Sequence, residues 1–142
     1  MDVFNLTRFV NAQTNSYDTA LSELRDGKKR SHWMWYIFPQ LAQLGRSPTA
    51  KHFGISSLAE AQAYLEHPIL GERLRMCTQA TLESDQNSAD AIFGYPDTLK
   101  FRSCMTLFDR VDKPLFQTAL DKYFDGAADE MTLKFLNTDS PR

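Results

Sequence analysis

The chain has 142 residues, the length of one ordinary domain with a hydrophobic core of its own. Hydrophobic residues make up 42% of it and aromatic residues 12%, which is a globular composition and excludes a disordered chain. The net charge of −2 makes nucleic acid an unlikely partner, and no apolar run reaches the roughly 18 residues of a membrane span.

Apolar residues at helical spacing run through the first half of the chain. Asp2 is expected to cap the first helix, and Gly27 stands where the second would end. Ser47 followed by Pro48 predicts a helix start, and Ser57–Glu60 has the pattern of a capping box. The predicted helices of this half lie near residues 4–10, 17–24, 31–38, 48–53 and 58–65.

The second half continues the same pattern. Asp97 is expected to cap a long helix, Pro114 lies in the first turn of the next, and Gly126 would end that one. No apolar run of period two predicts a strand. The predicted helices of this half lie near residues 70–81, 90–93, 97–111, 114–124 and 131–136.

These elements predict an all-α fold with a single compact domain of about seven to nine short helices in an irregular array. The domain is expected to span residues 1–137, with a frayed C-terminal tail over 138–142. Cys77 and Cys104 lie in apolar helical patterns, which is typical of buried thiols in a reducing compartment. The first residues lack a signal-peptide pattern, so we expect a cytoplasmic protein.

Residues 31–41 form the most aromatic segment and hold both tryptophans. A helix this apolar on every side should be buried, with His32 and Gln40 carried inside. His32, Trp35 and Tyr36 would share one side, where they could cradle a planar or sugar-like ligand. The alternative is that His32 bonds a core carbonyl group and the rings only pack. The other apolar side chains here, Trp33, Met34, Ile37 and Phe38, are assigned to the core.

Lys100 breaks the pattern of its helix. At 100° per residue it shares an apolar face with Ser103, Cys104 and Leu107, and it lies in the first turn, where the helix dipole disfavours a cation. A lysine carried inward there needs an anion. The alternative is that its side chain extends past Phe101 to water. Solvent-facing positions on the same helix are expected at Arg102, Thr106 and Asp109.

A basic run, Lys28–Arg30, directly precedes the aromatic segment. Such runs are usually solvated, but Arg30 and Ser31 precede a predicted helix start, where backbone N–H groups favour anions. These residues therefore predict a contact with a phosphate or carboxylate group. Arg46 and Ser47 form a weaker version of the same feature.

Motifs for metals, cofactors and nucleophiles are missing from the sequence. The three histidines lack zinc spacing, and there is no Cys-x-x-Cys pair. There is also no glycine-rich phosphate loop and no Gly-x-Ser-x-Gly nucleophile elbow. We therefore expect no cofactor and no metal site.

Five segments together resemble the domain of unknown function 1810 family, which is mainly bacterial and largely helical. The resemblance implies a helical fold and no assigned activity. Its segments are Asn5–Gln13, Ser31–Leu41, His67–Leu74, Ile92–Gly94 and Leu99–Phe108.

A weaker similarity links the chain to the NADAR proteins, small helical proteins of NAD-derived and ADP-ribose metabolism. It lies in the order of a Phe-x-x-Ala-Gln helix, a Ser-Pro-x-Ala-x-x-x-Gly turn and a His-Pro-x-Leu-Gly-x-Arg-Leu helix. The similarity implies a class of ligand, and no catalytic residue is carried over from it.

The leading hypothesis is an enzyme-like domain with a pocket for a small anionic molecule such as a nucleotide or an ADP-ribose-type compound. If it is an enzyme, hydrolysis of an N-glycosidic bond is the first candidate reaction. The alternative is a non-enzymatic protein–protein interaction module, which an exposed apolar patch on the last two helices would favour. The oligomeric state is left open. The expected ligand-binding residues are His32, Trp35, Tyr36, Lys100, Ser103 and Arg30.

Overall fold

The protein, seen in a computed structural model that describes residues 2–139, is all-α as predicted. Within that range it has ten α-helices and one short 3-10 helix, more than the seven to nine expected. The same residues form no sheet, and their isolated β-bridge joins Leu41 to Ile55. The helices are α1 (Thr7–Gln13), α2 (Tyr17–Arg25), α3 (Met34–Ile37), η1 (Ala42–Leu44), α4 (Pro48–His52), α5 (Leu58–Glu66), α6 (Leu70–Glu83), α7 (Ala89–Phe93), α8 (Asp97–Asp109), α9 (Lys113–Phe124) and α10 (Glu130–Asp139).

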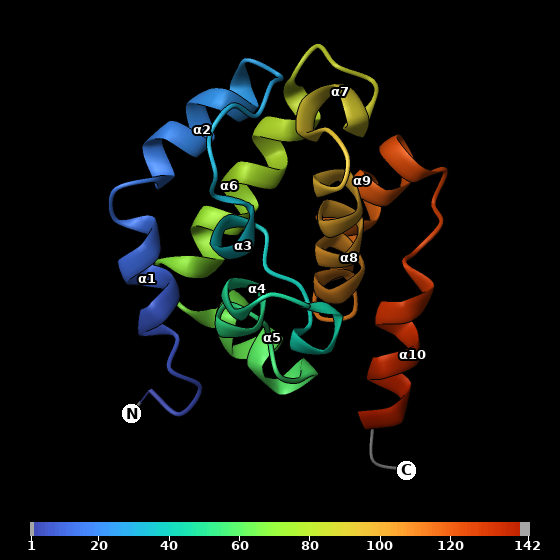
Figure 1. Cartoon of the computed structure of the whole chain (residues 1–142). Helices are drawn as coiled ribbons and strands as arrows, with labels where there is room; N and C mark the ends of the chain where they lie inside the picture. Colours follow the sequence, from blue (N-terminus) through green and yellow to red (C-terminus); the bar gives the residue numbers. More distant parts are fainter. Residues whose placement is uncertain (1, 140–142) are drawn as a thin grey trace.

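Helix α8 occupies the centre of the fold (Figure 1). It packs most extensively against α9, and it also contacts α5, α7 and α10. Nine of its 13 residues are buried, so α8 has almost no solvent-facing side. On the other side of the molecule α2 packs on α6. Helix α6 in turn packs against α5 and α9. A central helix covered from several directions explains how ten short elements share one core.

A cluster of three phenylalanine rings joins the aromatic segment and α7 to α8. The Phe93 and Phe101 rings stack with their centroids 4.5 Å apart. Phe38 meets both rings edge-on, at 5.1 Å from Phe101 and 5.8 Å from Phe93. Edge-to-face and offset arrangements are favourable for aromatic pairs, so this cluster anchors the aromatic segment against α8.

The aromatic segment is buried as predicted, but its helix is short. Trp33, Met34, Ile37 and Phe38 are each at most 2% exposed. Helix α3 covers only Met34–Ile37, rather than the predicted 31–38. The expectation that His32 is buried is wrong: it lies in the loop before α3 and its side chain is exposed.

Two predicted helix starts, at Ser47 and Ser57, are confirmed by hydrogen bonds. Asp2 accepts from the backbone N–H groups of Leu6 and Thr7, but α1 begins at Thr7, later than the predicted residue 4. Ser47 accepts from Ala50 at 3.0 Å, and Ser57 accepts from Glu60 at 3.2 Å. The predicted cap at Asp97 is wrong, because α8 starts at this residue without a side-chain cap, and its carboxylate bonds two lysines instead.

The expectation that Arg102, Thr106 and Asp109 face solvent is also wrong. Arg102 donates to the carbonyl oxygens of Ala127 and Ala128 at 3.0 and 3.2 Å. Thr106 and Asp109 are buried, and α10 lies along this side of α8 (Figure 1). The reason is that the segment leading into α10 crosses α8 and covers a face that the sequence of α8 alone presents as polar.

Both cysteines are free and buried, as predicted. None of the described helices combines the length and the apolar character needed to cross a membrane. The predicted tail begins at residue 138, but α10 continues to Asp139. Residues 140–142, the remainder of the predicted tail, lie outside the described part of the chain.

Candidate functional site

A cavity of about 490 Å³ lies where α8 begins, beside η1 and the start of α10. Three of its lining residues, Tyr95, Leu99 and Met131, are exposed hydrophobic residues, at 81%, 48% and 47% of their surface. The cavity therefore combines accessible apolar surface with charged groups. Its lining residues are Gln40, Leu44, Arg46, Tyr95, Pro96, Leu99, Lys100, Ser103, Asp129 and Met131.

Lys100 lies between this cavity and a shared carboxylate. Its Nζ is 3.3 Å from Oδ1 of Asp97 and 5.0 Å from the ring centroid of Trp35. The other oxygen of Asp97 is 3.0 Å from Nζ of Lys29, which in turn lies 5.3 Å from the Trp33 ring. One carboxylate thus forms ion pairs with two ammonium groups. Each ammonium group also lies over an indole ring.

This cluster carries an excess positive charge in a partly desolvated place. The side chains of Lys29, Asp97 and Lys100 are 9%, 20% and 25% exposed. Such charges are less screened by water than charges on an open surface. Asp97 supplies the anion that Lys100 requires, but the second oxygen of the same carboxylate pairs with Lys29. Lys100 therefore remains able to attract a second anion from the cavity.

The backbone N–H groups of Arg30 and Ser31 also bind an anion of the protein itself. The Glu23 carboxylate accepts from them at 2.8 and 3.0 Å. It also accepts from the Ser31 hydroxyl at 2.6 Å and from the Trp33 indole N–H at 2.9 Å. Burial raises the pKa of Glu23, but these four hydrogen bonds outweigh it and lower the pKa to about 2. The Arg30 side chain pairs with Asp26 at the surface.

His32 and Tyr36 are not among the residues that line the cavity. The Tyr36 hydroxyl donates to the Ser16 hydroxyl at 2.9 Å, and its ring lies 5.4 Å from that of Phe53. Tyr36 therefore packs toward the start of α2 and the end of α4. Of the six predicted ligand-binding residues, Lys100 and Ser103 line the cavity, and Trp35 contacts Lys100.

The comparisons with known proteins come from sequence and from structure. The family described as "Protein of unknown function (DUF1810)" matches residues 3–136. The chain belongs to the DUF1810 family. A similar solved structure is the crystal structure of the conserved hypothetical protein Rv1873 from Mycobacterium tuberculosis, at 49% identity and a TM-score of 0.93. The match covers 94% of this chain and 97% of that one. No curated protein matches the chain significantly, and the comparisons give no support to the weaker NADAR similarity.

Two further lining residues extend the site of this DUF1810 protein. Arg46, which the sequence indicated only as a weaker anion contact, lies beside the same cavity as Lys100. It forms no salt bridge with another residue of the described range 2–139. Asp129 was missed because it precedes a predicted helix in an ordinary loop. The sequence signal for Asp129 is the threonine three residues later, because this spacing is typical of a helix cap.

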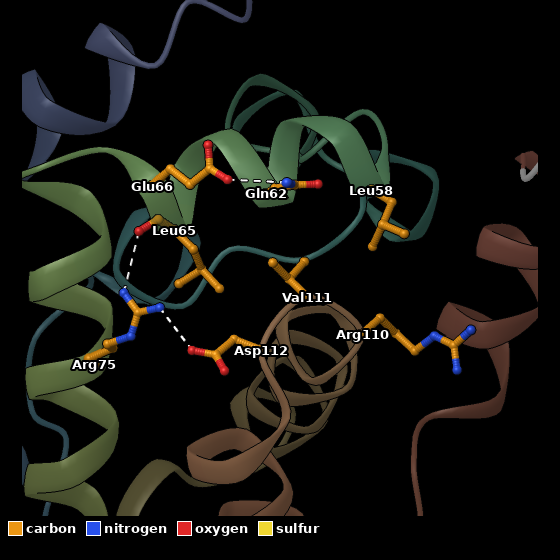
Figure 2. A pocket seen from close by; sticks show the side chains of 8 residues that line it. All are labelled: Leu58, Gln62, Leu65, Glu66, Arg75, Arg110, Val111 and Asp112. Carbon is orange, nitrogen blue, oxygen red and sulfur yellow. Dashed lines mark hydrogen bonds and ion pairs between the residues drawn. The ribbon is translucent and has the colours of Figure 1, made fainter.

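A second cavity, of about 300 Å³, is a weaker candidate. Figure 2 shows Leu65 and Val111 pointing toward its centre, while Arg110 extends away from it. Its other cation, Arg75, donates to the Leu65 carbonyl oxygen at 3.3 Å and pairs with Asp112 at 3.0 Å. Of its two cations, Arg75 is therefore already paired and Arg110 is turned outward.

Side chains that could bind a metal do not gather in the described part of the chain. No group of three or more His, Cys, Asp or Glu side chains in residues 2–139 is arranged to hold an ion. The two thiols are also poor nucleophiles, because burial raises the pKa of Cys77 to about 12 and that of Cys104 well above its ordinary value.

Proposed function

We propose that this protein binds a small organic anion of nucleotide size, such as an ADP-ribose-type compound, in the cavity at the start of α8. The observation that carries the proposal is the excess positive charge at Lys100. Asp97 is divided between Lys100 and Lys29, and Arg46 adds a cation that has no described ion-pair partner. A phosphate group would complete this arrangement with charge-assisted hydrogen bonds.

The size and the apolar part of the cavity support the same class of ligand. Its volume of about 490 Å³ falls in the usual range for pockets that hold small molecules. Tyr95, Leu99 and Met131 offer apolar surface for a base or another flat group, while the cations lie on the same cavity. An entirely apolar metabolite would leave the cations without a counterion.

A thermal-shift experiment tests this proposal. AMP, ADP, ADP-ribose and NAD at millimolar concentration should raise the melting temperature, whereas uncharged adenosine should not. A ligand at ten times its Kd stabilises the folded state by about 1.4 kcal/mol, which corresponds to a shift of several degrees in a domain of this size. Released nicotinamide or base, measured by chromatography in the same samples, would reveal hydrolysis of an N-glycosidic bond.

The matched variants are Lys100→Met and Lys28→Met. Methionine keeps an unbranched side chain over Trp35 but removes the charge, so Lys100→Met should abolish the shift. Lys28 is exposed, and Lys28→Met should leave the shift unchanged. The absence of any shift with wild-type protein, or an equal shift with adenosine, would contradict the proposal.

The second candidate function is a non-enzymatic protein-binding module. It is favoured by the exposed Tyr95, Leu99 and Met131, which line one cavity. Among the described residues of α9 and α10, the only exposed large hydrophobic residue is Met131, so these two helices do not carry the apolar patch that would have favoured this function. If no small anion binds, this surface becomes the leading site for a partner.

A further inference from the structure

Asp129 places a negative charge in a cavity whose other charged lining residues are cations. Among the described lining residues it is the single acidic one, opposite in sign to Lys100 and Arg46. No salt bridge joins Asp129 to any described lysine or arginine. The cavity therefore offers a ligand both hydrogen-bond-donating cations and an accepting carboxylate.

Hydrogen bonds hold the Asp129 side chain in one place. Its Oδ2 accepts from the Thr132 backbone N–H at 3.0 Å and from the Thr132 hydroxyl at 2.6 Å, and Thr132 is fully buried. Asp129 thus caps α10 with one carboxylate oxygen. The other oxygen, Oδ1, accepts no hydrogen bond from any described residue.

The backbone around Asp129 is fixed to α8. Its N–H donates to the hydroxyl of the buried Thr106 at 2.8 Å. Just before it, Ala127 and Ala128 accept from the Arg102 guanidinium. A ligand group that meets the free oxygen would therefore not have to order the carboxylate first, and the cost of binding is reduced.

We infer that Asp129 makes the cavity selective for anions that also carry hydroxyl groups, of which ribose phosphates are the matching class. The inference rests on the proposed function, because Lys100 and Arg46 must hold the anionic group. A carboxylate only accepts hydrogen bonds, so its partner on the ligand must be a donor. A hydroxyl suits it better than an ammonium group, because the cavity already has one cation more than it has anions.

Two nucleotides that differ only in their hydroxyls test this inference by isothermal titration calorimetry. AMP carries both ribose hydroxyls, and 2′,3′-dideoxyadenosine monophosphate carries neither. Wild-type protein should bind AMP about tenfold more tightly, because a hydrogen bond to a charged group is among the stronger kinds. In Asp129→Asn the preference should fall to about twofold or less, because a neutral amide replaces the charged acceptor. Asparagine preserves the helix cap, so the fold is retained.

The sign of the change in the dideoxy nucleotide separates recognition from damage. Asp129→Asn removes a negative charge from an anion site, so the dideoxy nucleotide should bind the variant at least as tightly as it binds wild type. Asp85→Asn, at an exposed position on the connection between α6 and α7, makes the same charge change elsewhere and should keep the tenfold preference.

The remaining outcomes are distinguishable. If neither nucleotide binds wild-type protein, the proposed function is wrong and the inference goes with it. If both bind equally, the anion site stands and the role of Asp129 is wrong. A loss of both ligands in Asp129→Asn would show that the carboxylate organises the whole site instead of selecting hydroxyl groups, and would contradict the inference. Tighter binding of phosphoethanolamine than of ribose 5-phosphate would show that Asp129 selects an ammonium group instead.

Discussion

The buried carboxylate of Glu23 should make the stability of this protein depend on pH in the acidic range. The side chain is 6% exposed and accepts hydrogen bonds from Ser31, Arg30 and Trp33. Burial raises its pKa, but these bonds favour the ionised form more strongly and lower the pKa from 4.5 to about 2. The loop before α3 is thus tied to α2 by four hydrogen bonds to one ionised carboxylate.

The sign and size of the effect follow from the two pKa values. Because the folded-state pKa is the lower one, ionised Glu23 stabilises the folded state above pH 4.5, and this contribution is lost as the pH falls toward 2. The difference between 4.5 and about 2 corresponds to about 3 kcal/mol. About 2 kcal/mol of this should be lost by pH 3.

Urea unfolding between pH 7 and pH 3 measures the loss directly. Wild-type protein should lose about 2 kcal/mol more than Glu23→Gln over this range, because glutamine does not titrate. Asp26→Asn is the matched control: Asp26 lies in the same region, but its ion pair with Arg30 is more than half exposed. Its pH profile should follow wild type. Parallel profiles for wild type and Glu23→Gln would contradict this prediction.

Three further predictions concern the core. Arg8→Met should lower the free energy of unfolding by about 3 kcal/mol in urea titrations, because it leaves the buried Glu60 carboxylate without its ion pair at 2.8 Å. Cys77 and Cys104 should not react with Ellman's reagent in the native protein at pH 8, and both should react in denaturant. Gly71→Ala should lower the melting temperature through a loss of at least about 2 kcal/mol, because a Cβ there would collide with a carbonyl oxygen at the end of α5. A variant as stable as wild type, or thiols that react in the native state, would contradict these assignments.

Local sequence signals were sufficient to predict where most of the helices lie. Capping at Ser47 and Ser57 depends on residues three positions away, and such short-range chemistry can be found in a single sequence. The aromatic helix was predicted too long for the opposite reason. Residues 30 and 31 donate their N–H groups to Glu23 of another helix, which holds the loop outside the helical pattern. No periodicity within 31–38 reveals that partner.

The polar face of α8 shows a second limit of the sequence. Arg102, Thr106 and Asp109 have the spacing of a solvent-facing stripe, and their side chains are polar. Yet Thr106 accepts from the Asp129 backbone, and Asp109 pairs with Lys113 at 3.0 Å while buried. A polar stripe predicts where hydrogen-bonding groups lie, but whether water or a later segment of the chain satisfies them is decided by tertiary packing.

The same limit applies to the candidate site. Periodicity correctly indicated that Lys100 needs an anion, but the anion found beside it, Asp97, had been assigned to a helix cap. An inward cation is therefore evidence for an anion, and it does not by itself show that the anion is a ligand. This site differs from the one at Arg30 and Ser31 in how the anion is used. Glu23 accepts hydrogen bonds from both backbone N–H groups there, whereas the Asp97 carboxylate beside Lys100 also pairs with Lys29. A ligand is favoured by this unbalanced charge and by the Asp129 carboxylate oxygen that is left free for a donor.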